Sequence, residues 1–377
     1  MYDVIVLGIG SMGSSALYQL AKRGVKVLGI EQFGIGHNFG SHSGKTRIIR
    51  KAYFEHPDYV PLLESAYDGW RLIEKETNKK LFHTVGLTYF GESDHPVIKG
   101  IKDSAELYDI ELERREVEKK HGPFIIPNAF ESILEPDAGF VIADEAIRAF
   151  TNQAQLSGAE IRIGEEVLDW RLVDGLVEVR TKQALYRAKK LILTAGAYTN
   201  QLMPELSNHL SITRQLLAWV KPKNPKLFTY GRLPCWVIAD KEYPGIIYGF
   251  PSLSVDEFGG SELVKIGHHA PGEKISLKNL HDYDPDVEKQ KLAKMMTKYF
   301  GDSLGEIVSL SECMYANTPD ENFVIDHLPD SGGRIVFASG FSGHGFKFTP
   351  VIGDVLADLS LKGETNHPID FLSISRF

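Results

Sequence analysis

Three glycines close to the N-terminus, Gly8, Gly10 and Gly13, have the types and spacing of a dinucleotide-binding turn. They follow an apolar, strand-like run and open a stretch with helical spacing. Such glycines allow the backbone to approach a pyrophosphate, whose negative charge is favoured at a helix N-terminus. Glu31 closes the next strand-like run, where a carboxylate accepts hydrogen bonds from a ribose and repels a 2′-phosphate. The pattern predicts a dinucleotide site, and by itself it fits FAD as well as NAD.

A second glycine-rich turn lies near the other end of the chain, at Gly340, Gly343 and Gly345. It joins a strand-like run to a helix-like one, so its backbone can approach a flat group such as a flavin ring. The following helix N-terminus would then favour the reduced, more negative ring. The alternative is a tight turn without a ligand. Cys313, upstream, has no Cys-X-X-Cys partner, and a lone cysteine is more often a small buried residue than a reactive one.

The elements that must position these residues alternate between strand and helix at both ends of the chain, which predicts an α/β fold. The middle is richer in strands and turns. We expect strands at 2–7, 25–30, 86–90, 171–180 (a hairpin turning at Asp174-Gly175) and 334–338, and helices at 14–23, 59–79, 111–120, 286–300 and 349–361.

This distribution predicts two interleaved domains, since a chain of 377 residues exceeds the usual size of one core. Residues 1–80, 141–214 and 312–377 are expected to form the dinucleotide-binding domain. Residues 81–140 and 215–311 are expected to form a sheet-based substrate domain.

Composition narrows the class of protein. The net charge is −8 with cations and anions interspersed, which argues against a nucleic-acid partner. No apolar run is long enough to span a membrane. Two cysteines, Cys235 and Cys313, are too few for a disulfide framework, so a reducing, cytoplasmic location is expected. No metal site is expected, because His37, His42, His268 and His269 lack ligand spacing.

Five dispersed motifs together resemble the monomeric sarcosine oxidase family, which includes N-methyltryptophan oxidase and the pipecolate oxidases. The likeness covers essentially the whole chain. The motifs are Gly8-Ile-Gly-Ser-Met-Gly13, Ser41-His-Ser-Gly-Lys-Thr-Arg47-Ile-Ile-Arg50, Tyr248-Gly-Phe-Pro251, Cys313-Met-Tyr315 with Thr318-Pro-Asp-Glu321, and Gly340–Phe348.

The resemblance implies FAD as cofactor, attached to Cys313 by a thioether. It also implies a Rossmann-type FAD-binding domain of the p-hydroxybenzoate hydroxylase type with an interleaved substrate domain. The chain is expected to act as a monomer on a small amino acid and O2.

The resemblance assigns roles to further residues. Arg50 and Lys347 match the pair that binds the substrate carboxylate, and Lys265 matches the lysine that activates oxygen. Residues that match positions lining the substrate or the cofactor are Thr46, Arg47, Val167, Thr194–Tyr198, Tyr248, His269, Tyr315, Gly343 and Lys347.

Two departures from the family pattern stand out. Ser43 and Lys45 replace a histidine and an aspartate, which predicts altered oxygen reactivity or redox tuning. The segment Ser254–Phe258 makes the chain longer between two pocket positions, so the substrate need not be sarcosine. Its spacing leaves open whether it covers the pocket or lies on the surface.

The function implied is oxidation of an N-methyl or cyclic secondary amino acid. A hydride equivalent passes from the carbon next to nitrogen to flavin N5, water hydrolyses the imine, and O2 becomes H2O2. The first alternative is an FAD dehydrogenase that passes electrons to a quinone or carrier. A nicotinamide-dependent dehydrogenase would need a catalytic set that the sequence does not supply, and a non-enzymatic sensor is the third alternative.

Overall fold

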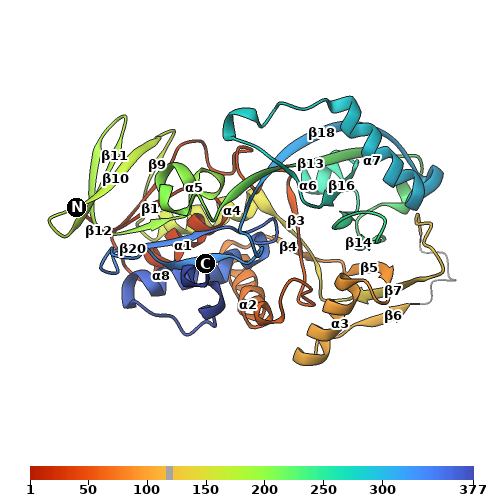
Figure 1. Ribbon diagram of the computed structural model, residues 1–377, viewed down its shortest axis with the longest axis horizontal. Coiled ribbons are helices and arrows are strands. Elements are labelled where there is room, and N and C mark those ends of the chain that lie inside the picture. The colour runs from red at the N-terminus through yellow and green to blue at the C-terminus, as the bar shows by residue number, and fades with distance from the viewer. Residues whose placement is uncertain (116–121) are drawn as a thin grey trace.

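Figure 1 shows the computed structural model, which describes residues 1–115 and 122–377 and is built around two large sheets set end to end. The first sheet has eight strands and is parallel at its centre, where β1 lies between β2 and β12. Its strands are β1 (Tyr2–Leu7), β2 (Val27–Glu31), β9 (Glu160–Ile163), β10 (Val167–Val173), β11 (Leu176–Thr181), β12 (Leu185–Leu193), β19 (Val324–His327) and β20 (Ile335–Ser339).

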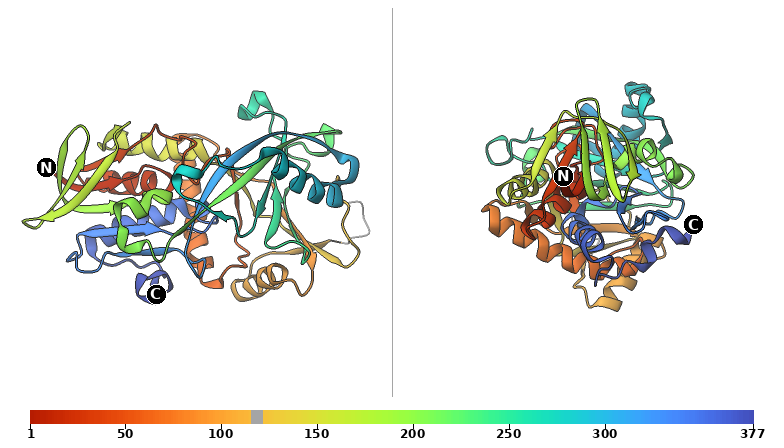
Figure 2. Two further views of the ribbon diagram at one scale, coloured as in Figure 1. Left: turned by 45° about the horizontal axis from the view of Figure 1, so that its top comes forward. Right: turned by 90° about the vertical axis from the view of Figure 1, so that its left-hand side faces the viewer.

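Four helices cover one face of this sheet, and the two views of Figure 2 show them as a layer beside it. α1 packs against two of the others because Ala16, Leu17, Leu20 and Ala21 all turn inward. These helices are α1 (Ser11–Lys22), α2 (Val60–Thr77), α4 (Ala143–Leu156) and α8 (Thr349–Lys362).

The second sheet has nine strands and is antiparallel except where β14 pairs with β5. Its strands are β5 (Leu87–Glu92), β6 (Glu113–Arg115), β7 (Phe130–Glu135), β13 (Ser211–Pro222), β14 (Cys235–Ala239), β15 (Ile246–Gly249), β16 (Val264–His269), β17 (Glu273–Lys274) and β18 (Leu304–Asn317). Helices α3 (Pro96–Tyr108), α6 (Val255–Phe258) and α7 (Pro285–Phe300) lie at this end, and α5 (Thr199–Leu202) lies beside the first sheet.

A small third sheet lies between the two large ones, as Figure 1 shows for β3 and β4. It pairs β3 (Thr46–Ile49) and β4 (Phe82–Thr84) with β8 (Gly139–Ile142). β3 thereby carries the segment Thr46–Arg50 to the boundary between the two ends of the molecule.

The α/β class and the two-sheet arrangement are confirmed, while the domain boundaries stay a prediction. The hairpin turn is confirmed as well, with φ of +50° at Asp174 and +77° at Gly175, as tight hairpins require. The helix predicted at 111–120 is wrong where it is described, because Glu113–Arg115 pairs with β7 as an edge strand. Residues 116–120 lie outside the described residues. None of the described helices is long and apolar enough to cross a membrane.

Candidate active site

The turn between β1 and α1 leaves open the approach to backbone N–H groups. A Cβ on Gly8 would lie 2.7 Å from the Thr194 carbonyl oxygen, and one on Gly13 would lie 1.8 Å from that of Gly8. A Cβ on Gly10 would meet no atom nearer than His42 Nδ1, at 3.9 Å. The backbone at Gly10 therefore borders free space. α1 also lacks a side-chain cap, which leaves its first N–H groups available to donate. These features fit the pyrophosphate of a dinucleotide.

Glu31 ends β2 beside this turn. Its carboxylate accepts hydrogen bonds from the backbone N–H of Ile9 at 2.8 Å and of Phe33 at 2.9 Å, and lies 3.5 Å from His37 Nε2. Burial acts to raise the pKa of Glu31, but the interactions with His37, Phe33 and Ile9 outweigh it and hold the pKa below its usual value. An ionised carboxylate is therefore available to ribose hydroxyls.

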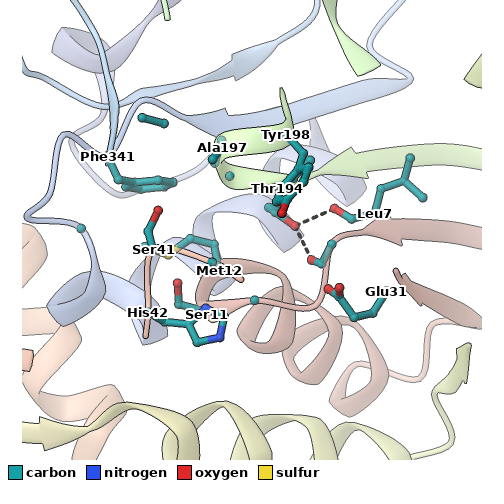
Figure 3. A pocket seen from close by; sticks show the side chains of 18 of the residues that line it. Leu7, Ser11, Met12, Glu31, Ser41, His42, Thr194, Ala197, Tyr198 and Phe341 are labelled. Carbon is teal, nitrogen blue, oxygen red and sulfur yellow. Dashed lines mark hydrogen bonds between the residues drawn. The ribbon is translucent and has the colours of Figure 1, made fainter. Parts of the chain in front are cut away.

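We call the cavity beside this turn the cofactor cleft, and Figure 3 shows Glu31, Ser41, His42 and Tyr198 around it. The Thr194 hydroxyl donates to the carbonyl oxygens of Leu7 and Gly8 at 3.0 and 2.8 Å, which fixes one wall. His42 Nε2 is buried and has no hydrogen-bond partner among the described residues, so a ligand can satisfy it. The cleft is also lined by Gly8, Gly10, Arg47, Val167, Ala195–Ala197, Gly340, Gly343 and Gly345.

The second glycine-rich turn runs from β20 to α8 along the same cleft. Gly340 and Gly343 have φ of +64° and +79°, in the left-handed region that favours glycine. A Cβ on Gly343 would lie 2.3 Å from the Tyr315 ring, so only glycine lets the turn pack against β18. Gly343 and Phe346 line both the cofactor cleft and the adjoining pocket, which places this turn at their junction.

Cys313 lies at the same junction, next to a fixed positive charge. Arg47 Nη2 is 3.6 Å from Cys313 Sγ, and the carbonyl oxygens of Ser41 and Thr46 hold the guanidinium at 2.7 and 2.8 Å. The thiol thus lines the adjoining pocket beside a cation that borders both cavities.

The adjoining pocket, which we call the carboxylate pocket, has two buried cations in one wall. Arg50 is 4% exposed and donates to both oxygens of Glu55 at 2.6 Å. Lys347 is 5% exposed and donates to the His344 carbonyl oxygen at 2.6 Å, with no carboxylate bonded to it among the described residues. With Lys347 protonated, these three side chains carry one excess positive charge, which a ligand carboxylate would neutralise.

The environment sets the protonation of this wall. Burial, and next the charge of Arg50, lower the pKa of Lys347 to about 7. Burial acts to raise the pKa of Glu55, but Arg50, His344 and Lys347 outweigh it and lower the pKa to about 2. Glu55 is thus an anion, and Lys347 gains or loses its proton near neutral pH.

His269, Tyr248 and Tyr315 also line the carboxylate pocket. His269 Nδ1 lies 3.2 Å from the Tyr315 hydroxyl. Burial lowers the pKa of His269 to about 4 and raises the pKa of Tyr248 to about 12, so both side chains are neutral at physiological pH. Together with Phe250, which also lines the pocket, they offer a polar but uncharged surface to the rest of a ligand.

Lys265 lies on β16 in a third cavity, which we call the Lys265 cavity. Its ammonium donates to the carbonyl oxygens of Gly44 and Thr46 at 2.7 Å each, and to the Thr46 hydroxyl at 3.2 Å. The ammonium also lies 4.5 Å from the centre of the Phe250 ring. Burial, and next the charge of Arg47, lower the pKa of Lys265 well below its usual value.

All the predicted site residues border one of these three cavities, except Gly13, which packs α1 against β1. The sequence did not single out Glu55, His344 or Glu135. Glu55 accepts from Arg50, the His344 carbonyl oxygen accepts from Lys347, and Glu135 holds the backbone directly after Arg50. Glu55 follows Arg50 by five residues after two aromatic side chains, and that spacing was the available signal. In residues 1–115 and 122–377, no group of three or more acidic, histidine or cysteine residues is placed to hold a metal.

The two departures from the family pattern are Ser43 with Lys45, and the segment Ser254–Phe258. Ser43, Lys45 and the residues that flank the segment line the Lys265 cavity. Ser43 donates to the Glu312 carbonyl oxygen at 3.0 Å, and Lys45, with φ of +63°, lines the Lys265 cavity. In the extra segment, Phe258 is buried against His83, whereas Val255 is 56% exposed. No residue of Ser254–Phe258 lines the carboxylate pocket, so the segment does not cover it.

Comparison with known families gives the class of protein. Residues 3–359 match the family described as DAO, FAD dependent oxidoreductase. The chain is 36% identical to monomeric sarcosine oxidase from Arthrobacter sp. (strain TE1826), covering 100% of this chain and 96% of that protein. It is 32% identical to the human peroxisomal sarcosine oxidase, with the same coverage, and 29% identical to N-methyl-L-tryptophan oxidase of Yersinia pestis (strain Pestoides F), covering 100% and 99%.

The chain therefore belongs to the monomeric sarcosine oxidase family of FAD-dependent oxidoreductases, and it is a flavin-dependent amine oxidoreductase. Among solved structures, the open form of NikD, an unusual amino acid oxidase, matches with a TM-score of 0.86 at 25% identity, covering 99% of this chain and 97% of that one. L-proline dehydrogenase from P. horikoshii has a TM-score of 0.82 at 22% identity, covering 99% and 96%, which shows the fold alone.

Proposed function

We propose that this protein oxidises the carbon–nitrogen bond of an N-methyl or cyclic secondary amino acid, with FAD attached through Cys313 and O2 as acceptor. The carboxylate pocket carries the proposal, because Arg50 and Lys347 form its wall beside Cys313. Relatives named sarcosine oxidase and N-methyl-L-tryptophan oxidase support the substrate class. Relatives named monomeric support a single-chain enzyme.

The protein's own residues bind and orient the substrate. Arg50 offers a planar fork and Lys347 a point charge to the substrate carboxylate. Glu55 already occupies the Arg50 fork, so a substrate carboxylate must share or displace that contact. Tyr248 and His269, which also line the pocket, carry no charge, and this favours the neutral amine over the ammonium.

FAD, when bound, supplies the oxidant for the carbon–nitrogen bond, and the protein supplies position and electrostatics. The residues that would hold it are those of the cofactor cleft, together with Cys313. Lys265, buried and fixed by three oxygen atoms, would stabilise negative charge that develops on an electron acceptor.

The test is anaerobic reduction of the purified holoenzyme by sarcosine, N-methyl-L-tryptophan, L-pipecolate and, as controls, glycine and dimethylamine. We expect at least one secondary amino acid to bleach the visible flavin band, and dimethylamine, which lacks a carboxylate, not to. The proposal would be overturned if none of the three secondary amino acids bleached the flavin band while dithionite did.

A matched pair of variants tests the carboxylate wall. Lys347→Met should raise the half-saturating substrate concentration by about 10- to 100-fold, the effect of losing a charge-assisted hydrogen bond. Lys51→Met is the control, since Lys51 is next to Arg50 in sequence but does not line the pocket. Equal effects of the two substitutions would contradict the assignment.

A further inference from the structure

The Lys265 cavity is distinct from the carboxylate pocket. Its volume is about 610 Å³, within the range of small-molecule sites and far more than O2 needs. Of the residues that line the two cavities, only Phe250 is shared. The cavity therefore offers a second approach to the centre of the molecule.

One row of side chains crosses the sheet in this cavity. Trp219 on β13 is the register partner of Lys265 on β16 and of Ser309 on β18, so all three lie on the same face. Ser309 is exposed at the rim and Lys265 is buried at the other end. The indole thus lies between solvent and the buried ammonium.

Apolar and aromatic side chains form much of the cavity wall, together with polar ones such as Asn38, Ser43 and Lys45. Its lining includes Trp219, Phe250, Pro251, Leu253, Leu263 and Leu310. Glu312, its one carboxylate, is bonded to His281 and Tyr283 at 3.2 and 3.0 Å. Lys45 also lines the cavity, but oxygen atoms of Gly44 and Thr46 accept from all three N–H groups of the Lys265 ammonium. Lys265 therefore has no donor left for the carboxylate of an amino acid substrate.

Such a lining suits a ligand that is neutral when it enters and negative after reduction. Apolar and aromatic walls favour a neutral planar ring, and the fixed ammonium of Lys265 stabilises negative charge that appears later. We propose that the Lys265 cavity binds a planar quinone-class molecule, which accepts electrons alongside O2. This inference rests on the flavin of the proposed function.

The reaction balances without a further reagent. Two electrons and one proton leave the reduced flavin, a second proton comes from solvent, and the quinone becomes a hydroquinone. Leu253 and Gly259–Ser261, which flank the extra segment, form part of the cavity lining. The extra segment itself lines neither cavity, and its Phe258 packs in the same core cluster as Phe250, which borders both.

The test uses duroquinone, whose ring positions are all substituted, so that it does not alkylate thiols. The holoenzyme is reduced anaerobically with dithionite and mixed with duroquinone in a stopped-flow instrument. We expect flavin reoxidation to saturate with duroquinone concentration. In the oxidised holoenzyme, duroquinone should quench tryptophan fluorescence saturably, and Trp219→Phe should abolish most of that quenching.

Two substitutions narrow the cavity without touching its buried end. Ser309→Phe and Ser261→Phe should raise the half-saturating duroquinone concentration about tenfold, equivalent to about 1.4 kcal/mol. Val308→Phe is the control, because Val308 is 49% exposed and does not line the cavity. A linear dependence on duroquinone, no reoxidation, or equal behaviour of the cavity variants and the control would overturn the inference.

Because dithionite reduces the flavin without any amino acid, the test of the acceptor site does not depend on the proposed substrate. If duroquinone behaves as expected while no secondary amino acid bleaches the flavin, the substrate assignment fails and the acceptor site stands. If the amino acids bleach the flavin but the rate of reoxidation does not saturate with duroquinone concentration, only the proposed acceptor site is refuted.

Discussion

Cys313 and Cys235 are both buried, yet their surroundings differ. Cys313 Sγ lies 3.6 Å from the Arg47 guanidinium, whereas burial in β14 raises the pKa of the Cys235 thiol. Cys313 lines the carboxylate pocket beside the cofactor cleft, whereas Cys235 lines neither of these two cavities.

Cys313→Ser should therefore release the cofactor when the protein is precipitated with acid, leaving a colourless pellet and a yellow supernatant. Cys235→Ser should behave like the unchanged protein, with a yellow pellet. The measurement is the visible spectrum of both fractions. A yellow pellet from Cys313→Ser would place the attachment elsewhere.

Lys265→Met should slow reoxidation of the reduced enzyme by O2 about 100-fold or more, because a fixed charge no longer stabilises the forming anion. Reduction by substrate should change far less, since Lys265 does not line the carboxylate pocket. Stopped-flow measurement of each half-reaction separates the two. Equal losses in both would remove this role from Lys265.

Lys347 predicts a pH dependence for carboxylate binding. Its pKa is about 7 without ligand, and only the protonated form attracts a carboxylate, so propionate should bind most tightly below pH 7 and more weakly above it. Arg50 stays charged, and Glu55, His344 and His269, with pKa values of about 2, 3 and 4, do not titrate in this window. Calorimetric titration should show a flat profile for Lys347→Met, and a persisting decline would contradict the assignment.

At the scale of elements, β3 and the chain after it carry Arg50, and β7 holds that chain in place. Glu135, at the end of β7, is fully buried and accepts hydrogen bonds from the backbone N–H of Lys51 and Ala52 at 2.5 and 3.3 Å. It also accepts one from the Tyr89 hydroxyl at 2.8 Å. Glu135 thus positions Arg50 without touching the substrate.

Glu135→Gln should lower the free energy of unfolding by about 1–3 kcal/mol, because an amide presents an N–H group to these donors. It should also raise KM more than it lowers kcat. Glu131→Gln on the same strand is the control, since its ion pairs with Lys102 and Arg114 are at the surface and contribute little. Urea unfolding measures the stability of each variant, and steady-state kinetics measures its KM and kcat. Equal changes in Glu131→Gln and Glu135→Gln would refute the positioning role of Glu135.

At the scale of the whole molecule, the cofactor cleft is assembled from segments far apart in the chain. Residues near positions 8, 31, 167, 194 and 340 border it, so a bound cofactor ties these segments together. Binding to the folded state alone raises stability by mass action, by about 2.7 kcal/mol at a concentration 100 times Kd.

FAD should therefore raise the Tm of the Cys313→Ser apoprotein, whereas riboflavin, which lacks the pyrophosphate and adenosine, should raise it far less. Glu31→Gln should reduce the shift with FAD, because its carboxylate is placed to accept from a ribose. Differential scanning calorimetry measures these shifts. Equal shifts with FAD and riboflavin would show that the turn at Gly8–Gly13 does not recognise the pyrophosphate.

The sequence alone was sufficient for the dinucleotide turn, the α/β class and the family, because each depends on local spacing or on motifs kept in order. One strand–turn–helix–strand unit is enough to bring together Gly8, Gly10, Gly13 and Glu31. The strand at Glu113–Arg115 was predicted as helix because its charged residues fit a solvated helix face, and only pairing with β7 decided otherwise.

The tertiary structure decided which distant side chains meet. The pairing of Arg50 with Glu55, the placing of Lys347 beside them, and the support from Glu135 depend on long-range packing that no local pattern encodes. The same holds for the row Lys265–Trp219–Ser309, because strand register is set by pairing between strands. The sequence thus determined the cofactor class, while the tertiary structure decided the charges that face the substrate and the cavity on the acceptor side.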